Sequence, residues 1–499
     1  MNWDRSYLYF ILLASLLTAI VIFFIPENRS RLRTVINLIG ATFKLVLVIL
    51  LMEGVSRGIE YESRISLLAH MDLVLRADRL GLLFISLSTV LWFLTTIYAI
   101  GYLEGSKNRS RFFGFFSLCV FSTVGVALAG NFMTFFIFYE LLTLSTYPLV
   151  VHRGTPDSLK AGRIYLTYTL GGGAFLLVGL VWLSTLAGNL EFQAGGFLGN
   201  LAESHRLELQ CIFVLMIAGL GVKAALVPLH GWLPQSMVAP APVSALLHAV
   251  AVVKAGAFGI VRVFYDVYGV SAVSKLGVSA GLAGLAAVTI IWGSVLALFQ
   301  DELKKRLAYS TVSQVSYIIL GTALIGQLST IGGLVHLVHQ GLMKITLFFC
   351  AGNLAETLGI HRVREMSGVG KRMPLTMGAF TICALGMIGV PPMAGFVSKW
   401  YLGIGSLEAG DWWVVVVLGT SSLLNAAYFL PMLYRVWFCK QEGEWPKEQC
   451  KWRFETHWML LAPPVITAII CILIGVFAES PWSPLEWVKT ITDEEYAPR

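Results

Sequence analysis

Charged residues are scarce in this sequence of 499 residues. Only 13% of the residues are Asp, Glu, Lys or Arg, whereas soluble domains contain roughly 25%. Hydrophobic residues make up 57% of the chain, and the mean hydropathy is +0.74. Apolar runs of about 20 residues, the length that crosses a bilayer, recur along the chain. The composition excludes a soluble enzyme domain and predicts a polytopic membrane protein.

The motifs of nucleotide and redox sites are also missing. The sequence contains no GxGxxG, Walker or CxxCH motif, and its seven cysteines form no CxxC pair. We therefore expect no metal, no cofactor and no catalytic site of the chain's own. The net charge of +7 is typical of basic loops beside a membrane and does not indicate nucleic-acid binding. The first apolar run has no cleavage signature and is interpreted as a retained helix.

About fourteen transmembrane helices are predicted. Lys and Arg gather in alternate loops, and the positive-inside rule then places both termini on the outer face of the cell membrane. The predicted spans are residues 6–25, 35–55, 82–102, 112–129, 131–151, 164–187, 211–229, 242–264, 278–299, 309–327, 330–354, 374–407, 412–437 and 457–477.

Proline interrupts two of these spans, which lie five spans apart. The seventh contains Pro228 and Pro234, and the twelfth contains Pro391 and Pro392. Paired interruptions in two halves of a membrane protein indicate inverted repeats. We predict two inverted five-helix repeats, helices 4–8 and 9–13. The predicted segments are 1–111 (helices 1–3), 112–264 (first repeat), 278–437 (second repeat) and 438–499 (helix 14 and the tail).

Ionisable residues inside the spans are the candidate site, because such residues are costly in a membrane and usually functional. Lys44 lies outside the repeats and is expected to make a local polar contact or to face a partner. The candidates for proton or ion translocation are Glu140, Lys223, His248, Lys254, His336, His339, Lys344 and Lys399.

These residue types suit a proton relay. A lysine in a medium of low dielectric constant releases its proton more readily, and a nearby carboxylate opposes that release. Histidine titrates near neutral pH and links such groups. Structural alternatives are a silent ion pair at Glu140 and packing roles for His248, His336 and His339. A metal site at the last two histidines lacks a third ligand one turn away.

Five segments resemble the antiporter-like membrane subunits of multisubunit Na⁺/H⁺ antiporters, respiratory complex I and membrane-bound hydrogenases. Together they span most of residues 112–437. The segments are FYELLTLSTYPLV, KAALVPLHGWLPQSMVAPAPVSALLHAVAVVKAG, DELKKRLAYSTVSQVSYIILG, HLVHQGLMKITLFFCAGNL and IGVPPMAGFVSKW.

The resemblance implies fourteen helices, inverted repeats and broken helices seven and twelve. It also implies that Glu140 and Lys223 form an ion pair, that Lys254 and the helix-eleven residues relay protons, and that Lys399 is the terminal residue. Some members carry glutamate at that last position. A lysine there, and the short stretch after Phe477, favour the D-type subunit of cation antiporters.

We therefore expect a proton-translocating subunit that works with other membrane subunits, including homologous antiporter-like ones, in the lipid bilayer. H⁺ is the expected ion, with Na⁺ as a further coupling ion. One alternative is a subunit of a redox-driven complex, either a membrane-bound hydrogenase or a complex I-type NADH:quinone oxidoreductase. An alternative of another class is a structural membrane scaffold.

Overall fold

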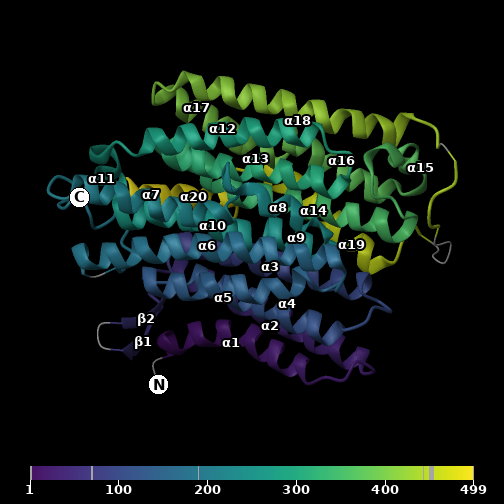
Figure 1. Ribbon diagram of the computed structural model, residues 1–499, viewed down its shortest axis with the longest axis horizontal. Coiled ribbons are helices and arrows are strands. Elements are labelled where there is room, and N and C mark those ends of the chain that lie inside the picture. Colours follow the sequence, from purple (N-terminus) through teal and green to yellow (C-terminus); the bar gives the residue numbers. More distant parts are fainter. Residues whose placement is uncertain (1–2, 69–70, 189, 442, 449–453, 498–499) are drawn as a thin grey trace.

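The computed structural model is a bundle of long helices that lie side by side, with a small β-hairpin at one end (Figure 1). It describes residues 3–68, 71–188, 190–441, 443–448 and 454–497. The first half contains α1 (Trp3–Phe23), α2 (Ser30–Ser56), β1 (Glu62–Leu68), β2 (Met71–Arg76), α3 (Arg79–Tyr102), α4 (Arg109–Ala127), α5 (Phe132–Val150), α6 (Pro156–Ala187), α7 (Arg206–Lys223), α8 (Trp232–Gln235), α9 (Ala241–Ala249) and α10 (Val252–Arg262).

The second half contains the remaining helices. They are α11 (Gly269–Leu276), α12 (Ser279–Leu298), α13 (Leu303–Ala323), α14 (Gln327–Leu358), α15 (Val369–Arg372), α16 (Pro374–Ile388), α17 (Ala394–Glu408), α18 (Trp412–Phe438), α19 (Trp458–Val476) and α20 (Pro484–Glu495). Short 3₁₀ turns lie at Leu229–Gly231, Ser236–Val238 and Val363–Met366, and a π-helical turn lies at Val263–Tyr268.

All fourteen predicted spans have helical counterparts. Within the described residues, eleven helical segments are long and apolar enough to cross a membrane. The three other predicted spans coincide with α7, with α13 and with the interrupted pair α16 and α17. Both termini lie at the same end of the bundle, as an even number of crossings requires (Figure 1). The prediction of an all-α polytopic membrane protein is confirmed.

The predicted break in the seventh span is present. α7 ends at Lys223, and short helical turns follow as far as Val238. Pro228 precedes the first of these turns, whereas Pro234 lies inside the four-residue helix α8. The chain therefore leaves the helix before its first proline, and the last carbonyl groups of α7 lose their regular partners.

The predicted break in the twelfth span is also present. α16 ends at Ile388, and α17 begins at Ala394, beyond Pro391 and Pro392. Gly389 terminates α16 with φ of +100°, a conformation that residues with a Cβ atom rarely adopt. The twelfth span is thus two half-helices, each of 15 residues.

Two features of the fold were not predicted. The eighth span is divided between α9 and α10 at Val250 and Ala251, although this stretch contains neither proline nor glycine. The hairpin of β1 and β2 adds a small antiparallel sheet, and Arg64 of β1 makes a two-pronged ion pair with Glu191. Both features depend on neighbouring segments that are distant in the sequence.

A buried ionic cluster lies near the end of the bundle that carries the termini. Arg262 is 2% exposed, and it donates hydrogen bonds to Asp78 (2.7 Å) and Asp266 (3.0 Å). Glu495 of α20 accepts a hydrogen bond from the backbone of Gly195 (2.8 Å). Burial, together with the nearby charge of Asp266, raises the pKa of Glu495 to about 9. The cluster ties α20 to α10 and to the start of α3.

Replacing Arg262 with methionine is expected to lower the free energy of unfolding by about 3–5 kcal/mol, because Asp78 and Asp266 would lose their shared counter-ion. Thermal unfolding of the purified protein in detergent measures this loss. The control is Arg57→Met, which removes an exposed pair with Glu53 that contributes little. Equal stability of the two variants would contradict the prediction.

Candidate functional site

An ion pair joins α5 to the end of α7. The Nζ atom of Lys223 lies 3.9 Å from Oε1 of Glu140 and donates a hydrogen bond to the backbone carbonyl of Tyr139. The same ammonium lies 3.2 Å from the centre of the Tyr139 ring. Lys223 is fully buried, whereas Glu140 is 20% exposed. The structure thus brings together the amine and the carboxylate that the sequence places two spans apart.

A glycine of α6 makes room for this carboxylate. A Cβ atom at Gly173 would lie 2.5 Å from Oε1 of Glu140. Any side chain at this position would therefore displace the carboxylate. The position of Glu140 therefore depends on Gly173, a residue without a side chain. The sequence of the ion-pair residues alone does not reveal this dependence.

Lys254 on α10 contacts the long helix α14. Its Nζ atom donates a 2.8 Å hydrogen bond to the carbonyl oxygen of Leu337, which lies between His336 and His339 in the sequence. Ammonium groups bind backbone carbonyls where a carboxylate is absent. This contact places Lys254 against the segment of α14 that carries both predicted histidines.

Lys223 and Lys254 lie on two closely packed helices, α7 and α10. A Cβ atom at Gly256 would lie only 2.4 Å from the backbone nitrogen of Ala224. Small residues of this kind let membrane helices approach closely. α7 and α10 therefore touch through their backbones at the level of the two lysines.

The carbonyl end of α16 holds Lys399. Its Nζ atom donates hydrogen bonds to the carbonyls of Met387 (3.0 Å) and Ile388 (2.8 Å) and to Oγ of Ser422 on α18 (2.9 Å). These carbonyls belong to the last turn of a helix, where no intrahelical N–H group is available. The C-terminal end of a helix also carries partial negative charge. The helix break therefore creates an acceptor site for an ammonium group.

His336 lies beside Lys399. Its Nδ1 atom is 2.8 Å from Oγ of Ser398, the residue that precedes Lys399. Its ring stacks on Tyr317 with ring centres 5.2 Å apart, and the Tyr317 ring centre is also 5.4 Å from Nζ of Lys399. One aromatic ring therefore contacts both predicted proton carriers.

A chain of hydrogen bonds connects Lys344 with Lys399. Nζ of Lys344 donates to Oγ of Ser310 (2.6 Å), which bonds to the hydroxyl of Tyr428 (2.8 Å). Tyr428 donates to Asn425. The Asn425 amide lies 3.4 Å from the same α16 carbonyl that accepts from Lys399. Side chains from α13, α14 and α18 thus join the two lysines.

His248 and His339 have fewer contacts with the other candidate residues of the site. The ring of His248 stacks on Phe348 at 4.5 Å, and among the described residues neither of its nitrogens has a hydrogen-bond partner. Nδ1 of His339 also lacks one within this part of the chain. The described residues include no group of three His, Cys, Asp or Glu side chains that could hold a metal ion.

Several linking residues were not predicted. Ser310 and Tyr317 lie on α13, and Asn425 and Tyr428 lie on α18. Polar residues of these types are common in helices, and nothing in the spacing distinguishes the linking ones. Only the packing of α13, α14, α16 and α18 against one another shows which of them meet.

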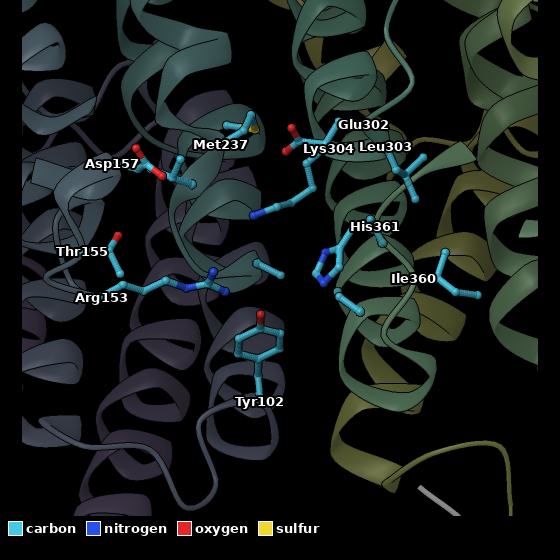
Figure 2. A pocket seen from close by; sticks show the side chains of 15 residues that line it. Tyr102, Arg153, Thr155, Asp157, Met237, Glu302, Leu303, Lys304, Ile360 and His361 are labelled. Atoms are coloured by element: carbon cyan, nitrogen blue, oxygen red, sulfur yellow. The ribbon is translucent and has the colours of Figure 1, made fainter. Parts of the chain in front are cut away.

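A cavity of about 360 Å³ opens where α3 ends and α13 begins, at the end of the bundle that we call the basic end. Arg153, Lys304 and His361 point into it from separate segments (Figure 2). Nζ of Lys304 lies 3.5 Å from Oγ of Ser244, which is one turn before His248 on α9. Lys304 therefore connects the lining of the cavity with the helix that carries His248.

Two family profiles match the chain. The family described as "NADH:quinone oxidoreductase/Mrp antiporter, TM" matches residues 129–425, which is more than half of the chain. The family described as "NADH-Ubiquinone oxidoreductase (complex I), chain 5 N-terminus" matches residues 66–113. The two matches together cover most of the bundle.

Individual relatives agree with these profiles. NADH-quinone oxidoreductase subunit N of Desulforudis audaxviator is 36% identical over 395 residues, which are 77% of this chain and 78% of that protein. The D-type Na(+)/H(+) antiporter subunit of Bacillus subtilis is 27% identical over 487 residues, 97% of this chain and 95% of that protein. A chain in the structure of the Mrp complex from Dietzia sp. DQ12-45-1b shares the fold, with a TM-score of 0.86 at 22% identity over 100% of this chain and 98% of that one. The chain therefore belongs to the family of antiporter-like membrane subunits that multisubunit Na⁺/H⁺ antiporters share with respiratory complex I and membrane-bound hydrogenases.

Proposed function

We propose that the chain is the proton-translocating subunit of a multisubunit cation/proton antiporter, with the role of its D-type member. The nearly full-length match to such an antiporter subunit supports this role. The observation that carries the proposal is the set of four lysines inside the membrane bundle, of which Lys223, Lys254 and Lys344 are fully buried and Lys399 is partly buried, at the contacts between α5, α7, α10, α13, α14, α16 and α17. Such residues inside a membrane protein mark ion pathways.

The balance of charge in this site favours proton movement. Glu140 is the one carboxylate, among the described residues, that forms an ion pair with any of the lysines Lys223, Lys254, Lys344 and Lys399. A buried ammonium group without a counter-ion is costly, so the four amines do not all stay charged together. A proton that arrives at one amine therefore favours proton release from its neighbour.

The proposed route starts in the cavity at the basic end. Protons pass Lys304 and His248 and then reach Lys223 and Lys254 on the neighbouring helices α7 and α10. They continue along His336, His339 and Lys344 of α14 and leave through Lys399. Water bound to buried polar atoms would bridge the gaps, since the side-chain amides of Gln314 and Gln340 have no hydrogen-bond partner among the described residues. Glu140 gates the route by holding or releasing the ammonium of Lys223.

The arrangement of the chain in the membrane completes the proposal. The basic loops face the cytoplasm, so both termini lie on the outer side of the cell membrane. Residues 112–264 and 278–437 form two five-helix repeats of inverted topology, supported by the matching breaks after α7 and α16. Homologous antiporter-like subunits pack beside this one, and Na⁺ is the counter-transported ion.

A redox-driven complex is the second candidate parent. Its support is the 36% identity to subunit N of an NADH-quinone oxidoreductase. Partner subunits would then supply all electron-transfer chemistry, and this chain would move protons by the same relay. The proteins that co-purify with the chain decide between the parents: iron–sulfur proteins indicate the redox complex, and small cation-antiporter subunits indicate the antiporter.

Removal of the ion pair tests the relay itself. Glu140→Ala and Lys223→Ala are each expected to reduce proton or sodium antiport in vesicles by about a hundredfold, because the gate and the first carrier are lost. The double variant Glu140→Gln with Lys223→Met leaves no unpaired charge, which separates lost transport from lost stability. Removal of the exposed pair Glu53 and Arg57 is the control. Unchanged transport in the ion-pair variants would favour a structural scaffold.

A further inference from the structure

A second cavity lies at the same end of the bundle as the cavity beside Lys304, where α3 ends. It has a volume of about 390 Å³ and lies between the starts of α2, α4 and α19 and the end of α3. Its polar lining includes Arg31, Arg33 and Arg109, with Glu104 and His457 also contributing. None of these residues takes part in the hydrogen bonds of Lys223, Lys254, Lys344 or Lys399.

The nearby carboxylates do not neutralise all three arginines. Arg33 is 2% exposed and bonds to Oγ of Ser110 (2.7 Å), and it lies 3.9 Å from the carboxylate of Glu27. Arg31 and Arg109 have no ion pair within the described residues, and Nε of Arg109 is a buried atom without a hydrogen-bond partner in this part of the chain. Unpaired guanidinium groups that share a cavity attract an anion.

The carboxylate of the nearby Glu27 is already hydrogen-bonded to the backbone of the protein. Its carboxylate accepts hydrogen bonds from the backbone N–H groups of Arg109 (3.0 Å) and Ser110 (2.8 Å) at the start of α4. Burial raises the pKa of Glu27, but these bonds and the charges of Arg33 and Arg109 outweigh it and hold that pKa below its usual value. With Glu27 and Glu104 counted, the three arginines still leave an excess of positive charge.

An apolar track leads away from this cavity toward the middle of the membrane. Val35 lines the cavity and is 50% exposed, and Ile39 (63%) and Phe43 (51%) follow it along the same face of α2. The last two also line an apolar groove of about 380 Å³ between α1 and α2. Gly40 lets the helices approach, since a Cβ atom there would lie 2.1 Å from the Thr18 hydroxyl oxygen.

We propose that this cavity binds the phosphate group of an anionic phospholipid, with one acyl chain in the groove between α1 and α2. Guanidinium groups bind phosphate oxygens through paired N–H donors, and the excess positive charge of this cavity suits a phosphodiester. Basic pockets between membrane helices on the cytoplasmic side are known to bind such head groups. A free phosphate ion shares the chemistry of the head group but has no acyl chain that could occupy the apolar groove.

The test uses the full-length protein in nanodiscs of neutral phosphatidylcholine to which phosphatidylglycerol is added. Native mass spectrometry measures how much anionic lipid each variant retains. The double variant Arg31→Gln with Arg109→Gln is expected to retain phosphatidylglycerol at least about tenfold more weakly than the natural protein. It leaves Arg33 in place, because that residue holds α4.

A matched control removes the same charge from the same face. Arg29 and Lys107 are exposed and lie outside the cavity, so Arg29→Gln with Lys107→Gln should retain the lipid as the natural protein does. Equal retention by both double variants would overturn the proposal. Inorganic phosphate that displaces the lipid at similar concentration would also overturn it, because the groove would then contribute nothing. Cross-linking of Val35 to a protein subunit instead of lipid would overturn it as well and would assign the face to a partner.

Discussion

Replacing Lys399 with glutamine is expected to lower proton transport by about a hundredfold or more without unfolding the protein. In the natural protein the Lys399 ammonium donates hydrogen bonds to the carbonyl end of α16 and to Ser422. The glutamine amide can still donate hydrogen bonds to these groups. It cannot accept and release a proton at neutral pH. Proton uptake by vesicles that contain the assembled complex measures the loss, and the amount of folded protein is measured in parallel.

Lys44 offers a matched control for this substitution. It is fully buried in a membrane helix, whereas Lys399 is partly buried, and its ammonium donates a 2.8 Å hydrogen bond to Ser15 beside the ring of Trp92. It lies outside the contacts that join the relay lysines. Lys44→Gln should therefore keep most of the transport activity. If both variants lost activity equally, burial of the lysine rather than its place in the relay would explain the effect.

Replacing Gly256 with valine is expected to destabilise the protein by about 3 kcal/mol or more, and to reduce transport with it. The new Cβ atom would lie 2.4 Å from the nitrogen of Ala224 and 2.9 Å from the carbonyl oxygen of Leu220. Both contacts are with backbone, which cannot rotate away. α7 and α10 would have to separate, and the distance between Lys223 and Lys254 would increase.

Gly284 on α12 is the control position for this experiment. Among the described residues, no atom outside the adjoining backbone lies within 4 Å of a Cβ atom placed there, so Gly284→Val should change stability by no more than about 1 kcal/mol. Thermal unfolding in detergent compares the two variants. Equal midpoints would show that α7 and α10 do not depend on their close contact.

The order of helices and the two proline breaks were predictable from the chain. Apolar runs of the right length reveal membrane helices because the bilayer has a fixed thickness. Pro391 and Pro392 reveal a break because proline lacks an N–H group. The break between α9 and α10 has no such signal. It lies where the end of α9 packs on α14, since a Cβ atom at Gly341 of α14 would lie 3.2 Å from the carbonyl oxygen of Ala249.

The candidate site was predictable in its charged members and not in its polar links. Intramembrane lysines and glutamates stand out in a sequence because their burial is costly. Tyr428, Asn425 and Ser310 do not stand out, although they complete the chain between Lys344 and Lys399. The arginines beside α2 and α4 resemble ordinary basic loop residues in the sequence, and only the structure shows that they share a cavity.

The sequence by itself determined that the chain is a membrane protein, where its helices lie and which residues are costly to bury. These properties depend on local composition and on the cost of charge in lipid. Only the tertiary structure decided which groups meet. It brings Lys223 to 3.9 Å from Glu140, aims the free carbonyls of α16 at Lys399, and places Lys254 against α14. Those contacts depend on the close approach of helices through glycine, and no single segment of the chain contains that information.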